Sequence, residues 1–410
     1  MRLLKVDTLA EAREKLLKAA ENKIPAVETV GFEEALGRVL AEDLSSKDSI
    51  PGFRKSTVDG YAVMAKDTQG VTESIPVFLD VIEEVAIGIQ PEKTVGPGQA
   101  VYVPTGGMVP EGADAMVMIE YCEKFDDTSI AVYNSVSPGR SIIMEGEDIM
   151  SGAQFLKKGK IIRPQEVGVM ASAGVTEVQV YKPWKITIIS TGDELVDAKQ
   201  KPEKGQTRDI NTYSVSSISR NHGFEIIDRK VLKDDKEILT AAISKAMAES
   251  DVVICSGGSS QGEKDHTADV MDQLSNEGVF THGIAIRPGK PTILGYDEKT
   301  ETILVGLPGH PAAAMLVFEL MVIWLYRQLT GQKEAPKTLA RISENVAGGA
   351  GRTTCLLLEL TEGEDGIYIA EPVLGKSGLM TTLTRADGYT LVHGDTEGLK
   401  EGELIRVTLF

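Results

Sequence analysis

Apolar and polar positions follow different periods in different parts of the chain. Near the N-terminus apolar residues recur at helical spacing after Thr8, which predicts a helix over residues 9–21 capped by that threonine. Between about residues 50 and 140 short β-rich runs alternate with Gly and Pro turns, a pattern typical of an all-β insertion. Strands are expected there at residues 77–81, 100–103, 115–119 and 129–132. The flanking segments predict helical pieces at residues 32–37 and 165–173 and a strand at 176–180.

From residue 185 strands and helices alternate. Strands are expected at residues 186–190, 225–231, 252–255 and 303–305, and helices at 211–221, 236–249, 267–276 and 311–329; Asn211 is expected to cap the first of these helices, and Pro311 stands at the start of the last. This alternation indicates a parallel sheet with helices on both faces. After Pro336 only short strands follow, at 339–344, 355–360, 366–370, 390–392 and 404–409. They predict a small β-barrel or sandwich.

The expected fold class is therefore multidomain, α/β and β, which suits a chain of 410 residues. We assign residues 1–48 and 141–180 to a helical linker domain and residues 49–140 to an inserted β domain. Residues 181–330 are expected to form an α/β domain with a parallel-rich sheet, and residues 331–410 a C-terminal small β-barrel.

Composition excludes several classes of protein. The net charge of −18 leaves no general basic face for nucleic acid or for an anionic membrane. The three cysteines are far apart and form no CxxC pair, which excludes a disulfide framework or zinc knuckle and favours the cytoplasm. The longest apolar run, residues 311–325, contains Glu319 and is shorter than the ~20 residues of a bilayer span, so we expect a buried helix. We expect no nucleic-acid or membrane partner.

Three expected strands end in glycine-containing loops, which follow residues 190, 255 and 305. Ligands of open α/β sheets bind beyond the carboxyl ends of the strands. Glycine lets backbone N–H groups approach phosphate oxygens, and a following helix N-terminus favours an anion. The three junctions together predict one composite ligand pocket.

Charged residues near these loops and elsewhere extend this hypothesis. Carboxylates at such loops commonly hold Mg²⁺ against phosphates, although capping or solvation is the alternative for any one of them. The candidates are Asp193, Glu194, Asp265, Glu147, Asp148 and, beside Gly60 and Tyr61, Asp59. Arg287 and Lys290 stand three residues apart between prolines, which suits an oxyanion, the alternative being a solvated turn.

Taken together, these motifs resemble the MoeA family of molybdopterin molybdenumtransferases, to which the E domains of gephyrin and of the plant molybdenum insertase are related. The resemblance covers essentially the whole chain in family order. It is carried by residues 53–63 (FRKSTVDGYAV), 104–107 (PTGG), 146–149 (GEDI), 190–195 (STGDEL), 256–258 (SGG), 288–291 (PGKP), 306–309 (GLPG), Arg352 and 375–378 (GKSG).

The resemblance implies an elongated homodimer of four-domain subunits, with a MogA/MoaB-like α/β domain and an active cleft that involves both subunits. It also implies the reaction, in which adenylylated molybdopterin and molybdate give molybdenum cofactor and AMP with Mg²⁺ as the divalent cation. Molybdopterin adenylyltransferase is the implied upstream partner.

The resemblance further implies roles for individual residues. The implied catalytic residues are Asp59, Thr105, Asp148 and Glu194, and the implied metal ligands are Asp234 and Asp265. Substrate contacts are implied for Ser256, Gly257, Gly258, Ser260, Arg287, Lys290, Pro308, Pro311, Arg352 and Ser377.

The chain departs from the family pattern at Gln261, His310 and Ala313, where Ala313 lacks a hydroxyl that relatives can offer near the oxyanion. Three alternatives therefore stay open: a tungstate-handling paralogue, a molybdopterin-binding or sensor protein without turnover, and a hydrolase of another nucleotide on the same scaffold. The acidic set favours turnover, because a pure binder has no need of Asp59 and Asp148 facing a phosphoanhydride.

Overall fold

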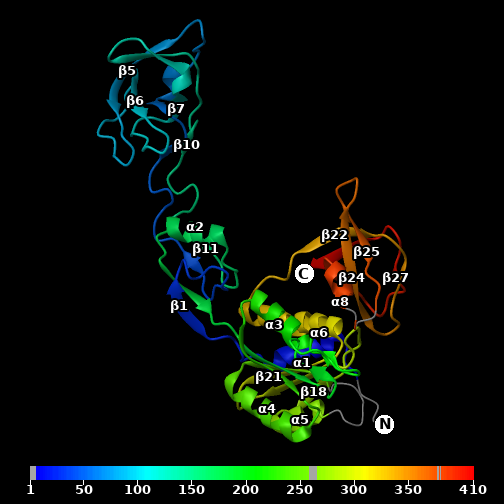
Figure 1. The fold of residues 1–410 in the computed structure, drawn as a ribbon. Coiled ribbons are helices and arrows are strands. Elements are labelled where there is room, and N and C mark those ends of the chain that lie inside the picture. The colour runs from blue at the N-terminus through cyan, green and yellow to red at the C-terminus, as the bar shows by residue number, and fades with distance from the viewer. Residues whose placement is uncertain (1–5, 258–265, 376–377, 379) are drawn as a thin grey trace.

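The computed structural model describes residues 6–257, 266–375, 378 and 380–410. Four residues expected in the site, Gly258, Ser260, Asp265 and Ser377, lie outside the described residues, as does Gln261. The molecule is elongated: a distal β domain sits at the end of a narrow linker region, away from a larger body that holds both termini (Figure 1).

The distal domain is built on a six-stranded sheet. Its order is β7 (Ala115–Met118), β4 (Gly60–Val63), β6 (Gln99–Val103), β5 (Val77–Glu84), β9 (Ser129–Val132) and β8 (Cys122–Lys124). Alternate residues of β4 enter two different apolar clusters, Tyr61 and Val63 one and Ala62 the other, so both faces are covered. The strands predicted from residues 77 to 132 are confirmed, while β4 and β8 were missed.

The linker region is less helical than expected. Its elements are β1 (Val27–Gly31), β2 (Leu44–Ser45), β11 (Gln154–Leu156), α2 (Pro164–Ser172) and β12 (Glu177–Tyr181). Strand β1 pairs with β12 and β2 with β11, so the two halves of the region are joined across the inserted domain. Residues 32–37 form turns and not the expected helix, and the structure ends this segment at Gly37, whose φ is +78°.

The central sheet has four parallel strands and two antiparallel ones. Its order is β16 (Glu225–Leu232), β13 (Lys185–Thr191), β17 (Val252–Ser256), β21 (Thr302–Leu307), β20 (Ile293–Asp297) and β18 (Val279–His282). The first four are parallel, as predicted, and β20 and β18 form an unpredicted antiparallel edge.

Helices cover both faces of this sheet (Figure 1). One face carries α3 (Asn211–Asn221) and α6 (Pro311–Phe318), and the other carries α4 (Lys236–Glu249) and α5 (Thr267–Leu274). Two separate apolar clusters form, because each buried strand presents alternate residues to opposite faces. Thus Ile188 and Ile254 enter the α3 side, whereas Ile189 and Val253 enter the α4 side.

Helix α1 (Leu9–Ala19) packs on the central domain and not on the linker region. Thr8 caps the helix as expected, and Glu11 completes a capping box. The buried face of the helix, Leu9, Ala12 and Leu16, joins the cluster on the α3 side of the sheet. Helix α1, which belongs to the expected segment 1–48, thus contributes to the apolar core beside the central sheet.

The long C-terminal helix of the central domain contains a widened turn. Residues Glu319–Ile323 form a π-helix between α6 and α7 (Trp324–Thr330). Arg13 of α1 donates to the Leu320 carbonyl through Nε at 3.0 Å and Nη2 at 2.8 Å, and stacks over Trp324. By length and composition Pro311–Thr330 could cross a membrane, yet 67% of its most apolar window is buried, as expected for a core helix.

The C-terminal region is a closed five-stranded barrel. Around it run β24 (Thr353–Glu362), β25 (Tyr368–Pro372), β22 (Lys337–Ile342), β28 (Leu404–Leu409) and β26 (Gly388–Val392), which pairs again with β24. A sixth strand comes from the central domain: β19 (Ile286–Arg287) pairs in parallel with the start of β24. The predicted barrel is confirmed, and β19 attaches it to the body.

Glu166 of α2 makes the stability of the linker region depend on pH. The side chain is buried and accepts hydrogen bonds from Arg163 N, Nε and Nη2, with Lys160 Nζ at 3.2 Å. The Arg163 side-chain bond, with backbone and Lys160 support, lowers the pKa of Glu166 to about 2. The stabilisation is therefore complete above pH ~4.5 and is lost as the pH falls through about 2.

We expect Glu166→Gln to lower the melting temperature near pH 7, and the difference from wild type to narrow as the pH falls from about 4.5 toward 2. Differential scanning calorimetry between pH 7 and pH 2.5 measures it, with exposed Glu177→Gln as the control. A difference in melting temperature that stays constant across this pH range would contradict the lowered pKa of Glu166.

Candidate functional site

The loops after β13, β17 and β21 meet at their glycines. Gly257 has φ +96°, and a Cβ built on it would lie 2.2 Å from the Thr191 carbonyl oxygen. The atom nearest to a Cβ built on Gly309 is Gly257 Cα, at 3.9 Å. These loops lie at one edge because the parallel strands end in register, with Ser190 opposite Ser256 and Ser256 opposite Leu307.

The N-terminus of α3 crosses this edge and is held there by two side chains that sequence reasoning missed. Asp209 is buried and accepts hydrogen bonds from Ser190 Oγ at 2.8 Å and from the hydroxyl of Thr212. Asn211 was expected to cap α3; instead it is the first helical residue, and its Nδ2 donates to Ser256 Oγ and the Gly309 carbonyl. Asp209 stands two residues before the predicted helix 211–221, and this position was the sequence signal that could have identified it.

Carboxylates gather beyond β13 and β16. Asp234 N donates to Asp193 Oδ1 at 3.3 Å, and the Thr191 hydroxyl lies 3.5 Å from Asp234 Oδ1. Glu194 is exposed, and its carboxylate lies close to Gly192. Within the described ranges no group of three His, Cys, Asp or Glu side chains is arranged around a common point for a metal. Asp265, the other expected ligand, lies outside these ranges.

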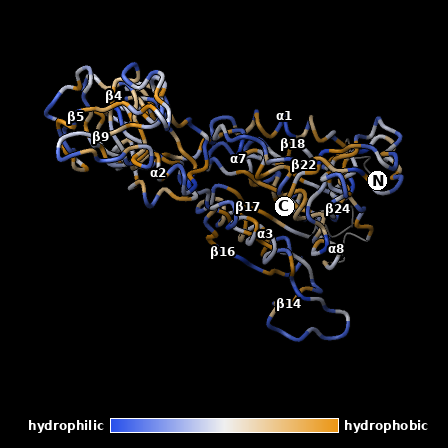
Figure 2. The backbone as a smooth tube through the Cα atoms, turned by 90° about the horizontal axis from the view of Figure 1, so that it is seen from above, coloured by the Kyte–Doolittle hydropathy of each residue, from blue (hydrophilic) through white to orange (hydrophobic). Residues whose placement is uncertain are grey.

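Glu194 also stands at the base of a projecting arm. The chain leaves the body through β14 (Leu195–Val196) and returns through β15 (Thr207–Arg208), and the segment between them is mainly hydrophilic (Figure 2). The Glu194 carbonyl accepts from Thr207 N at 2.8 Å, which closes the arm where it leaves the body.

The segments that carry three expected cations meet where the central domain joins the barrel. Pairing of β19 with β24 places Arg287 opposite Thr354, two residues beyond Arg352, and Thr353 N donates to the Ala285 carbonyl. Lys290 follows in the same segment, held by bonds from Ile284 N and Thr292 N to its carbonyl. All three cations are exposed, and none forms an ion pair with a carboxylate in the part of the chain that the structure describes.

Other residues expected at these loops are buried. Ser256 is 1% exposed, Pro308 is buried, and Pro311 begins α6 within the core. Ala313 is 2% exposed in the first turn of α6, so a hydroxyl there would not face solvent. Burial raises the pKa of Cys255 to about 12, which keeps it a thiol and agrees with its interpretation as a small core residue.

The barrel also approaches the loop after β21. A Cβ built on Gly378 would lie 3.9 Å from the His310 ring. The segment that follows β25 therefore reaches the same loop that carries Gly309.

The remaining expected catalytic residues lie in the distal part of the molecule (Figure 1). Asp59 precedes β4, and its Oδ1 accepts from Thr105 N at 2.9 Å. Asp148 N donates to the Ile50 carbonyl at the base of that domain. All three side chains are exposed. Within one chain, the structure does not bring them to Glu194 or to the loops of the central sheet.

Gly60 keeps Asp59 in place. A Cβ built on Gly60 would lie 2.0 Å from the Val117 carbonyl oxygen, so only glycine fits between β4 and β7. The neighbouring Tyr61 is buried and packs edge-on against Tyr102, which makes it a core residue and not a site residue.

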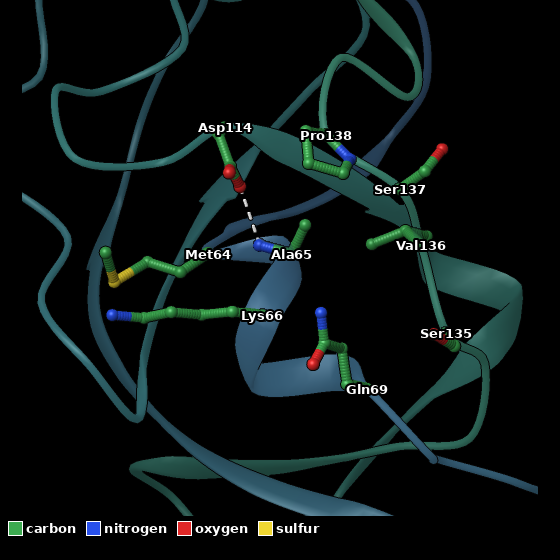
Figure 3. A pocket seen from close by; sticks show the side chains of 9 residues that line it. All are labelled: Met64, Ala65, Lys66, Gln69, Asp114, Ser135, Val136, Ser137 and Pro138. Atoms are coloured by element: carbon green, nitrogen blue, oxygen red, sulfur yellow. Dashed lines mark hydrogen bonds between the residues drawn. The ribbon is translucent and has the colours of Figure 1, made fainter.

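An open cavity of about 590 Å³ lies in the distal domain (Figure 3). Its polar lining comes from Lys66, Gln69, Asp114, Ser135 and Ser137. The Asp114 carboxylate accepts from Ala65 N at 2.6 Å and so fixes the start of a short 3₁₀ helix. None of the expected site residues lines this cavity.

Models of protein families match three successive parts of the chain. The MoeA N-terminal region (domain I and II) matches residues 7–174, and the MoeA C-terminal region (domain IV) matches residues 340–410. The model described as "Probable molybdopterin binding domain" matches residues 187–328, the part that holds the central sheet and its loops.

Curated proteins and solved structures agree with these matches. The chain is 30% identical over 391 residues to the molybdopterin molybdenumtransferase of Staphylococcus aureus, covering 95% of this chain and 92% of that protein. Two crystal structures of molybdopterin biosynthesis MoeA proteins from Pyrococcus horikoshii are similar to it. They show 37% and 31% identity and TM-scores of 0.79 and 0.83, with at least 99% of each chain covered.

The arrangement of distal domain, linker, molybdopterin-binding domain and barrel thus defines a protein of molybdenum cofactor biosynthesis. The chain belongs to the MoeA family of molybdopterin molybdenumtransferases. The expected fold class, including the MogA/MoaB-like domain, is confirmed.

The neighbouring glycines Gly257 and Gly309 should respond differently to substitution by alanine. We expect Gly257→Ala to lower the melting temperature, because its Cβ would clash with the Thr191 carbonyl and its φ is +96°. Gly309→Ala should leave the melting temperature unchanged, since its Cβ meets only ordinary van der Waals contact. Thermal unfolding followed by circular dichroism compares them, and equal effects would contradict the described packing.

Proposed function

We propose that the chain inserts molybdate into adenylylated molybdopterin, forming molybdenum cofactor and releasing AMP. Family membership supports the reaction class. The observation that supports the proposal is the pairing of β19 with β24, which joins the segments of two domains that carry the exposed cations Arg287, Lys290 and Arg352, called here the cationic patch. An acidic protein with exposed cations free of carboxylate partners in its described part suits a doubly charged oxyanion.

The loops after β13, β17 and β21 are proposed to hold the phosphate-bearing part of the adenylate. Their glycines bring backbone N–H groups to the edge of the sheet without intervening side chains. Ser256, Pro308 and Pro311 are buried there, so they would act by shaping the backbone. Gly258 and Ser260 continue the loop after β17 in the sequence, and Ser377 lies beside Gly378.

The carboxylates beyond β13 and β16 fit a divalent cation. Mg²⁺ prefers oxygen ligands, and Asp193, Asp234 and the Thr191 hydroxyl present oxygen atoms close together. Asp234, with Asp265, which follows β17 in the sequence, would hold Mg²⁺, which when bound would supply positive charge to neutralise phosphate oxygens. Glu194, exposed at the same edge, would orient or deprotonate the attacking oxygen.

We propose that the active cleft is completed by a second copy of the chain. Asp59, Thr105 and Asp148 lie in the distal part of the molecule, and a single chain keeps them away from the central loops (Figure 1). A two-fold dimer would allow the distal domain of one subunit to reach the central domain of its partner. The proposed setting is the cytoplasm, with molybdopterin adenylyltransferase supplying the adenylate.

AMP release tests the reaction. Wild type incubated with adenylylated molybdopterin should release AMP, detected by mass spectrometry, in a manner that depends on molybdate. Asp59→Asn should keep the melting temperature and reduce the rate by roughly 10²-fold or more, since it removes a charge and keeps the size. Exposed Asp127→Asn in the same domain is the control. Binding without AMP release would favour the sensor alternative, and a stronger response to tungstate the tungstate alternative.

The cationic patch predicts a change in molybdate dependence. Lys290→Ala and Arg352→Ala should each raise the molybdate concentration for half-maximal rate roughly ten- to a hundredfold, because loss of one charged contact costs ~1.5–3 kcal/mol. Lys299→Ala and Arg406→Ala, both exposed, are the matched controls. A Lys290→Ala variant with wild-type molybdate dependence but weaker adenylate binding would assign Lys290 to the phosphates instead.

Mixing two variants tests the shared cleft, at a molybdate concentration low enough that the Lys290→Ala variant is inactive by itself. Asp59→Asn and Lys290→Ala alter opposite sides of it, so random mixed dimers should regain about a quarter of wild-type activity, since half of the dimers are mixed and each has one intact cleft. Analytical ultracentrifugation should show a species of twice the 44.1 kDa chain mass. A monomer, or no recovery on mixing, would contradict the proposed dimer.

A further inference from the structure

The side-chain amide of Asn211 links the end of β17 to the loop after β21. Asn211 is 6% exposed, and its Nδ2 donates to Ser256 Oγ at 2.6 Å and to the Gly309 carbonyl oxygen at 2.9 Å. Ser256 is the last residue of β17, and Gly309 lies in the loop after β21. Asn211 begins α3, so the contact also ties both loops to the helix.

The orientation of this amide follows from its partners. The Gly309 carbonyl can only accept a hydrogen bond, so the nitrogen of Asn211 has to face it. Its Oδ1 is then buried, and it has no hydrogen-bond partner among residues 6–257, 266–375, 378 and 380–410. A buried acceptor without a hydrogen-bond partner destabilises the folded state. Asn211 is thus a poor choice for stability alone, which points to a role in the site above it.

The two groups that Asn211 contacts lie where the loops after β17 and β21 come closest to each other. Ser256 directly precedes Gly257, and Gly257 is the nearest neighbour of Gly309 across the loops. The loop after β17 is held on one side, because Gly257 packs on the Thr191 carbonyl. The Asn211 amide holds the loop after β21 through the Gly309 carbonyl.

We propose that Asn211 is a positioning residue of the ligand site, which sets the separation of the loops after β17 and β21 through Ser256 and the Gly309 carbonyl. It does not touch the ligand; it keeps the backbone donors of both loops at the spacing that a phosphate group requires. The inference rests on the proposed function, in which these loops hold the phosphate of an adenylate.

The test measures binding of AMP to the full-length chain by isothermal titration calorimetry. We expect Asn211→Ala and Ser256→Ala each to raise the Kd for AMP about tenfold, and the double variant to raise it little beyond Asn211→Ala, because both changes remove the Asn211–Ser256 hydrogen bond. Asn211→Asp keeps the side-chain size but loses the donor, so it should weaken AMP binding at least as much as Asn211→Ala.

Asn221→Ala is the matched control, since Asn221 is the exposed last residue of the same helix. A purely structural role would lower the melting temperature of the Asn211 variants and leave their Kd for AMP unchanged below that temperature. Such a result, or additive effects of Asn211→Ala and Ser256→Ala, would overturn the inference while AMP binding by wild type upholds the proposed function. Failure of wild type itself to bind AMP would overturn both.

Discussion

The register of four parallel strands is the constraint on which the rest of the site depends. Because β13, β17 and β21 run in the same direction and in register, their following loops have to leave from one edge of the sheet. At that edge the backbones approach so closely that Gly257 has no room for a side chain against the Thr191 carbonyl. The same crowding leaves backbone groups, and not side chains, as the surface that a ligand meets.

Two buried polar residues then fix the start of α3 across this edge. Asp209 ties the helix to Ser190 at the end of β13, and Asn211 ties it to Ser256 at the end of β17. Polar groups that are buried stabilise a fold only when they are paired. Asp209 meets this condition fully and Asn211 meets it in part, which separates a residue that secures the fold from one that we connect with binding.

The barrel is part of the site because of a two-residue strand. The barrel packs on the body where Cys355 and Tyr389 enter the apolar cluster on the α3 side of the sheet, and the pairing of β19 with β24 places the Arg352 segment at this junction. With this pairing, the barrel contributes a cation beside the proline-braced pair of the central domain. The distal domain has no such attachment to the body, and the linker holds it away, which is the physical reason for proposing that its acidic residues serve a second subunit.

The sequence by itself determined the elements that have a strong period and clear ends: α4, the four parallel strands, the barrel strands and the Thr8 cap of α1. It also determined the glycine loops and the cations as candidates, because glycines after parallel strands suit phosphates and cations braced by prolines suit an oxyanion. It failed for the β18–β20 edge and for Asp209 and Asn211. These features depend on which surfaces pack together in the folded chain. Short polar segments have no hydrophobic periodicity from which that packing could be predicted. Only the tertiary structure decided that the expected catalytic residues fall into two groups, since separation in space arises from the rigid linker and is not encoded in any local pattern of residues.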